Sequence, residues 1–100
     1  MYVAMNRFRI GEGREAEFEK TWRERDSYLD EVPGFQKFRL LRGPTAEGVT
    51  LYVSHSLWES RDAFEDWTRS DSFRKAHATA RSAEGVVLGH PNFEGFEQVL

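Results

Sequence analysis

The chain has 100 residues, 14 basic and 17 acidic, so we expect a single domain over residues 1–100, and its net charge of −3 argues against nucleic acid as a partner. Because there is no cysteine, disulfides, a thiolate nucleophile and cysteine-ligated metals are excluded. The sequence shows no signal peptide and no apolar run long enough to span a bilayer, which predicts a cytoplasmic protein with no membrane partner.

The first half of the chain predicts a strand, a helix and a second strand. Residues 2–10 alternate between two faces, and Asn6 is the one polar residue on the apolar face. From residue 14 to about residue 29, large side chains recur at helical spacing, and Pro33-Gly34 then ends the helix. Its glutamates predict a solvated outer face, and residues 35–41 predict the second strand. The inner face of the helix consists of Phe18, Trp22, Arg25 and Leu29.

The second half predicts a strand, a helix in two pieces and a last strand. A loop with turn residues at 43–44 and 47–48 precedes residues 49–58, which are rich in β-branched and aromatic residues. Ser60 is a plausible N-cap for a short helix, and Ser70 or Asp71 for another. Residues 92–100 predict the closing strand. The apolar faces of the two helical pieces consist of Ala63, Phe64 and Trp67, and of Phe73, Ala76, His77 and Ala80.

The predicted order is β-α-β-β-α-β, which is typical of the ferredoxin-like α+β fold. In this fold an antiparallel sheet carries helices on one face only. The other face of the sheet is then left bare, so two such sheets can pack face to face across a two-fold axis. We therefore expect a homodimer.

His77 is the first candidate for chemistry. It lies between Phe73 and Ala80 on the predicted inner face of its helix, where a histidine can be a hydrogen-bonded core residue. The alternative is a single imidazole ligand to an iron, as in haem proteins with a proximal histidine. The small residues around it, Ala76, Ala78 and Ala80, would allow a flat macrocycle to approach the helix. From the residues alone, both interpretations stay open.

Asn6 and Trp67 are the other two candidates. An amide on an apolar strand face must find hydrogen-bond partners or costs about 1–3 kcal/mol. Asn6 is therefore either a structural bridge to a loop or a donor that stabilises negative charge on a reacting oxygen without supplying a proton. Trp67 is either a large core aromatic or a wall that presses on a macrocycle and distorts it.

The remaining polar candidates are two histidines and three cationic side chains. His55 shares a strand face with apolar residues, which predicts a packed or interface residue, and His90 before Pro91 predicts an exposed loop position. Arg25, Arg74 and Lys75 are cationic side chains that could reach carboxylates of a bound cofactor.

Residues 58–67 (WESRDAFEDW) and 70–77 (SDSFRKAH) resemble a segment of the antibiotic-biosynthesis-monooxygenase domains, W-x-S-x-x-A-F-x-x-W followed by S-x-x-F-x-x-A-H. Within that superfamily the chain is most similar to the Isd-type haem-degrading monooxygenases of bacteria. The likeness covers essentially the whole chain, including Asn6 on the first strand. The core motif marks only the wider superfamily, whereas the combination of Asn6, Trp67 and His77 is much narrower.

The resemblance implies a dimeric α+β barrel that binds haem as both cofactor and substrate. His77 would ligate the iron, Asn6 would act on the opposite side, and Trp67 would ruffle the porphyrin. The reaction would need O2 and an external electron donor such as a reductase, because the chain has no flavin or nicotinamide fingerprint. The further haem-contacting residues that we expect are Trp22, Phe73, Arg25 and Arg74.

Three alternatives use the same fold. The first is a cofactor-free monooxygenase acting on a phenolic or quinol substrate, with His77 as a base. The second is a haem carrier that binds haem and leaves it intact. The third is a dimeric interaction domain without chemistry. A haem titration separates the first from the haem-binding interpretations.

Overall fold

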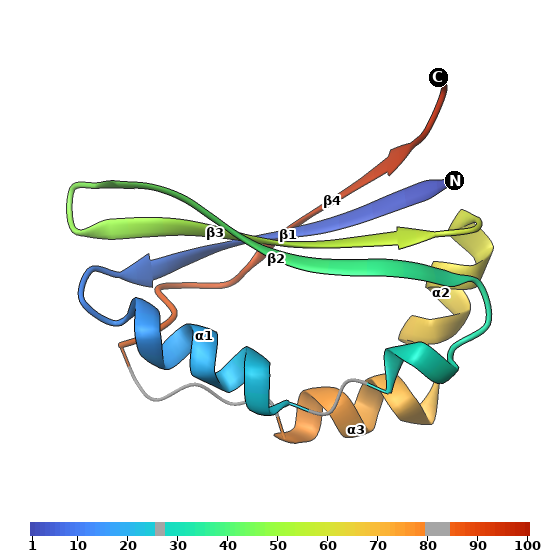
Figure 1. Ribbon diagram of the computed structural model, residues 1–100, viewed down its shortest axis with the longest axis horizontal. Helices are drawn as coiled ribbons and strands as arrows, with labels where there is room; N and C mark the ends of the chain where they lie inside the picture. The colour runs from blue at the N-terminus through green and yellow to red at the C-terminus, as the bar shows by residue number, and fades with distance from the viewer. Residues whose placement is uncertain (26–27, 80–84) are drawn as a thin grey trace.

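The computed structural model describes residues 1–25, 28–79 and 85–100, with only the backbone described at residues 77–79. Four strands form one antiparallel sheet in the order β2-β3-β1-β4, and the helices cover one face of it (Figure 1). This arrangement confirms the predicted ferredoxin-like α+β fold. The elements are β1 (Tyr2–Gly11), α1 (Glu15–Glu24), a 3-10 turn η1 (Leu29–Glu31), β2 (Phe35–Ala46), β3 (Val49–Trp58), α2 (Arg61–Thr68), α3 (Asp71–Thr79) and β4 (Asn92–Glu97).

The alternation in β1 decides which face of the sheet the helices cover. β1 lies between β3 and β4, and its residues Tyr2, Ala4 and Ile10 are buried on the helix side. Because successive side chains of a strand point to opposite faces, Asn6 lies on this same inner face. The prediction that Asn6 is the polar exception among core-facing residues is therefore confirmed.

The hairpin between β2 and β3 is longer than the sequence predicted. β2 runs to Ala46, and the turn consists only of Glu47 and Gly48, with φ angles of 54° and 78°. Two residues with positive φ make the tight turn that matches the twist of antiparallel strands. Gly43 and Pro44 were predicted to lie in a loop, but they lie within β2. This strand is at the edge of the sheet, where the missing N–H of a proline is tolerated.

The first helix is shorter than predicted. α1 ends at Glu24, because Arg25 has extended backbone angles. Leu29 belongs instead to η1, which follows a left-handed residue at Tyr28, and its side chain still reaches the core. The periodicity therefore predicted the burial of Leu29 correctly but not its secondary structure. The last strand also ends earlier than predicted, at Glu97.

The core consists of two clusters between the sheet and the helices. The first contains Trp58 and is closed by side chains of α2, including Phe64 and Trp67. The second contains Tyr52 and is closed by α1 through Phe18 and Trp22. The helix layer is divided in the same way: α1 lies under one end of the sheet and α2 under the other (Figure 1).

Candidate functional site

A row of three paired residues, two of them polar, crosses the inner face of the sheet where the two core clusters meet. Asn6 of β1 is paired with Ser54 of β3, which is in turn paired with Leu40 of β2. Ser54 is buried, and Asn6 is half-buried. Residues Ala4 and Phe8, two positions before and after Asn6, belong to the first and the second cluster respectively. We call this row, Asn6–Ser54–Leu40, the seam.

The Asn6 side chain presents its amide group at the seam. Among the described residues, no hydrogen bond engages its side chain, so the alternative of a structural bridge to a loop is not observed there. Partial exposure leaves the amide reachable by solvent, which reduces the cost of leaving it unpaired. The amide is therefore available to donate to, or accept from, a bound molecule.

Trp67 forms the wall of the seam on the side of α2. Ser60 caps this helix by accepting a hydrogen bond from the Ala63 N–H at 3.1 Å, as its sequence predicted. The Trp67 ring lies 5.2 Å from that of Trp58 and 4.8 Å from that of Phe73, which it meets edge-on. Trp67 thus packs against the core while its position remains half-buried. Phe73, another predicted haem contact, joins it from α3.

His77 lies in α3, whose backbone the structure describes to Thr79. Ser70 begins this helix by accepting a hydrogen bond from the Phe73 N–H at 3.2 Å, so the predicted cap is confirmed. The side chain of His77 lies outside the described part of the chain, as do Ala80 and the side chain of Ala78. The assignment of His77 as iron ligand therefore stays a prediction.

Trp22 and Arg25 form the opposite wall, on the side of α1. The Trp22 ring stacks on that of Phe38 at 5.3 Å and 21°, and the Arg25 guanidinium lies 4.5 Å from its centre. Arg25 Nε is buried and has no hydrogen-bond partner among the described residues. Burial also lowers the pKa of Arg25 from its ordinary value, because a desolvated cation is less stable. A carboxylate is the natural partner for such a group.

The predicted contact residue Arg74 is placed differently. Its side chain is mostly exposed on α3 and pairs with Asp71 one turn earlier. It is thus engaged at the surface, whereas Arg25 has a buried donor available. We therefore favour Arg25 over Arg74 as the cation that meets a carboxylate of a ligand.

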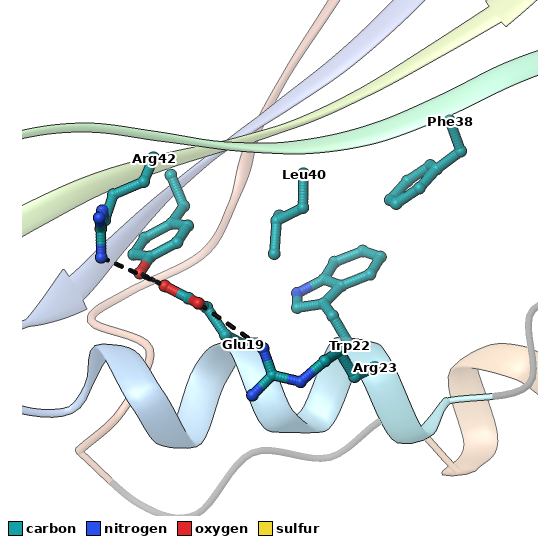
Figure 2. A pocket seen from close by; sticks show the side chains of 7 residues that line it. Glu19, Trp22, Arg23, Phe38, Leu40 and Arg42 are labelled. Atoms are coloured by element: carbon teal, nitrogen blue, oxygen red, sulfur yellow. Dashed lines mark hydrogen bonds and ion pairs between the residues drawn. The ribbon is translucent and has the colours of Figure 1, made fainter.

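A cavity of about 420 Å³ between α1 and β2 is lined mostly by residues that no sequence pattern indicated (Figure 2). Of the predicted site residues, Trp22 alone is among the described residues that line it. Glu19 was expected on the solvated face of the helix, but its carboxylate accepts a 2.5 Å hydrogen bond from the Tyr52 hydroxyl. One sequence signal could have indicated this cavity. Arg42 is a charged residue on the same strand face as the apolar residues Phe38 and Leu40, where a further core residue would be expected. The other charged lining residue is Arg23.

The other histidines lie away from the seam. His55 is on the helix-free face of the sheet, opposite Met5 and Arg39, which agrees with the predicted packed or interface position. His90 is exposed, as predicted. Within the described residues, no group of three or more histidine, aspartate or glutamate side chains could hold a metal ion.

The fold is that of an α+β protein of the ferredoxin-like class, and the seam is its candidate ligand site between sheet and helices. Residues 1–79 match the antibiotic biosynthesis monooxygenase family, so the chain belongs to this family. The resemblance seen in residues 58–77 is thereby confirmed.

Proteins of known activity are similar over nearly the whole chain. A haem oxygenase (mycobilin-producing) of Mycobacterium tuberculosis is 36% identical over 98 residues, which are 98% of this chain and 89% of the relative. A haem oxygenase (staphylobilin-producing) of Staphylococcus saprophyticus is 29% identical over 94 residues, 90% of this chain and 88% of the relative. The solved structure of the haem degrader MhuD from M. tuberculosis, with two haems in its active site, superposes with a TM-score of 0.76 at 31% identity, covering 100% of this chain and 97% of that one.

Proposed function

We propose that the protein is a haem-degrading monooxygenase, which binds haem between the helices and the sheet and opens the porphyrin with O2 and external electrons. The observation that carries the proposal is the seam, where the Asn6 amide, which no described residue engages in a hydrogen bond, lies between two aromatic walls. The relatives named as haem oxygenases support the same activity.

The side chains around the seam fit a porphyrin. A flat apolar ring needs apolar walls, which Trp67 and Phe73 supply on one side and Trp22 on the other. A haem also carries carboxylates, and the buried Nε of Arg25 lacks an acceptor among the described residues. The aromatic side chains thus suit the apolar ring of haem, and Arg25 suits its carboxylates.

Each side chain would have a separate task in the reaction. Bound haem supplies the iron that activates O2 and the ring that is oxidised. His77 would hold the iron from the side of α3. The Asn6 Nδ2 group would donate a hydrogen bond to the reacting oxygen and keep its own proton, because a neutral amide is not an acid at any working pH. Trp67, fixed by Trp58 and Phe73, would form a rigid wall against the ring and help to hold it in the site.

The electrons would come from a separate donor, such as a reductase. No helix of the described residues is long and apolar enough to cross a membrane. We further propose that the reaction takes place in the cytoplasm. O2 and haem would be its small-molecule partners.

Haem addition followed by reductant in air tests the proposal. We expect a saturable Soret shift with one haem per site, then loss of the band and appearance of a product with the mass of an opened tetrapyrrole. A Soret shift without ring opening would instead indicate a haem carrier. Absence of a saturable shift would contradict haem chemistry and favour the cofactor-free alternative.

We also propose that two chains pair through the helix-free face of the sheet, forming the dimeric α+β barrel. This face carries apolar side chains from neighbouring strands, and Leu41 and Phe96 are 44% and 47% exposed on it. Val53 lies at its centre, paired with Arg7 on one side and Leu41 on the other. Burying this surface against a second copy would remove it from water.

Sedimentation of the protein at micromolar concentration tests the pairing. The wild type is expected at twice the mass of one chain, and Val53→Lys at the mass of one chain, because an unpaired charge in an apolar interface is costly. Asp62→Lys, which adds a lysine on the exposed surface of α2, serves as control and should remain a dimer. A monomeric wild type would contradict the proposal.

A further inference from the structure

The cavity between α1 and β2 has an apolar part and a charged part (Figure 2). Phe38 and Leu40 reach down from β2, and Trp22 reaches up from α1. At the other end Glu19 lies between the two arginines, Arg23 from its own helix and Arg42 from β2. The cavity thus has the two-part character of a site for an amphipathic molecule.

The charged part has one carboxylate for two guanidinium groups. Glu19 Oε2 lies 3.6 Å from Arg42 Nη1, and Glu19 Oε1 lies 3.8 Å from Arg23 Nη1. Neither distance is that of a hydrogen bond, and the two arginine side chains are 69% and 64% exposed, so most of their donors face solvent. A second carboxylate would balance the charge of this group.

Tyr52 does not change the balance of charge between Glu19 and the two arginines. Burial and its hydrogen bond to Glu19 raise the pKa of Tyr52 to about 12, so the hydroxyl stays neutral near pH 7. It donates a hydrogen bond to Glu19 and adds no charge beside the two arginines, whose side chains are mostly exposed.

Glu15, one turn before Glu19, is engaged elsewhere. Its carboxylate accepts hydrogen bonds from the Thr50 hydroxyl at 2.8 Å and from the Gly13 N–H at 2.7 Å. These bonds lower the pKa of Glu15, and the charge of Arg42 is the smallest of the causes. Glu15 is therefore not a second partner that satisfies Arg42.

The apolar part adjoins the seam. Leu40 lines the cavity and is also the third residue of the row that begins at Asn6. Two strand spacings separate the two residues, which is roughly 10 Å. A flat molecule at the seam can therefore extend an edge over Leu40 toward the arginines. The rings of Trp22 and Phe38, which stack on each other, line this apolar part and supply the apolar surface that such a molecule would contact.

We propose that this cavity is a carboxylate subsite, in which a ligand's carboxylate binds Arg42 and Arg23 while its flat apolar part lies against Trp22 and Phe38. The carboxylate could come from two sources. The first is a propionate of haem bound at the seam, and for this source the inference rests on the proposed function. The other source is a separate small aromatic acid. Both ligands share the feature that the subsite would recognise, a carboxylate attached to a flat apolar ring system.

The first experiment titrates haem and its uncharged dimethyl ester into the wild type and three variants, followed at the Soret band. Arg42→Gln is expected to weaken the binding of haem about tenfold and to leave the ester unchanged, because only haem offers a carboxylate. Glu19→Gln keeps an acceptor for Tyr52 but removes the repelling charge, so haem should bind more tightly, by about threefold. The control is Arg61→Gln, which removes an arginine of similar exposure on α2 and should change neither.

The second experiment uses naphthalene-2-carboxylate and its neutral carboxamide, followed by calorimetry in the absence of haem. Binding of the acid but not of the amide, lost in Arg42→Gln and strengthened in Glu19→Gln, supports the subsite for a separate acid. The same charge-dependent pattern with haem and its ester supports the propionate source.

The outcomes separate this inference from the proposed function. If the wild type binds no haem, the proposed function fails, and the naphthalene-2-carboxylate measurement alone decides about the subsite. If haem binds but neither ligand pair responds to the two substitutions, the subsite is overturned and the proposed function stands. Opposite shifts for Arg42→Gln and Glu19→Gln cannot arise from a common loss of folding, because misfolding would weaken binding in both.

Discussion

His77→Ala is expected to weaken haem binding by about a hundredfold or more and to abolish the Soret band of the ligated complex. The reason is that a single imidazole would supply the only protein bond to the iron, and the rest of the site offers only packing and carboxylate contacts. The measurement is a haem titration followed by optical spectroscopy of the ferric and ferrous complexes.

The chain offers a matched control for this variant. His90→Ala removes an exposed loop histidine and should leave the spectrum unchanged. Added imidazole is expected to restore a ligated spectrum in His77→Ala, because it can occupy the space that the side chain leaves. An unchanged spectrum in His77→Ala would remove His77 as the ligand, and a rescued spectrum would show that the pocket had stayed intact.

Asn6→Ala is expected to slow haem degradation about a hundredfold while changing haem affinity by about twofold or less. A donor aimed at a reacting oxygen contributes in the transition state more than in the ground state, so its loss lowers the rate rather than the binding. The measurement is the single-turnover loss of the Soret band after reduction in air, at saturating haem.

Asn92→Ala is the matched control for this second variant. Asn92 is exposed on β4, where it is paired with Arg7 rather than placed at the seam. It should degrade haem at the wild-type rate. Normal turnover in Asn6→Ala would exclude Asn6 from the mechanism, and an equal loss of affinity and rate would indicate that the amide contributes to binding instead.

The strands and the helix caps were predictable because their signals are local. The alternation in β1 places Asn6 on the inner face, and Ser60 and Ser70 cap α2 and α3 through bonds to residues three positions ahead. The end of α1 was not predictable in this way. Leu29 continues the helical spacing, yet the helix ends before Arg25, which is extended. The spacing reports that the Leu29 side chain is buried, and a side chain can be buried from a 3-10 turn as well as from a helix.

The length of β2 shows a second limit. Gly43 and Pro44 are turn residues by composition, and they would end a central strand. They remain in β2 because it is an edge strand with a register shift between Arg42 and Thr45. Position within the sheet, which no local pattern encodes, decides whether such residues are tolerated.

The sequence by itself predicted the fold class and two candidate residues of this region, Asn6 in the seam and Trp67 in its wall. It did so because alternation, helical spacing and the WESRDAFEDW motif each depend on neighbours in the chain. Only the tertiary structure decided that the core divides into two clusters, with Asn6, Ser54 and Leu40 in one row between them.

The same holds for the cavity beside it, where Glu19, Arg42 and Tyr52 meet. These three residues come from α1, β2 and β3, and no spacing along the chain relates them. Their meeting depends on the register of the hairpin and on how α1 packs against the sheet, and both are set by packing between distant segments.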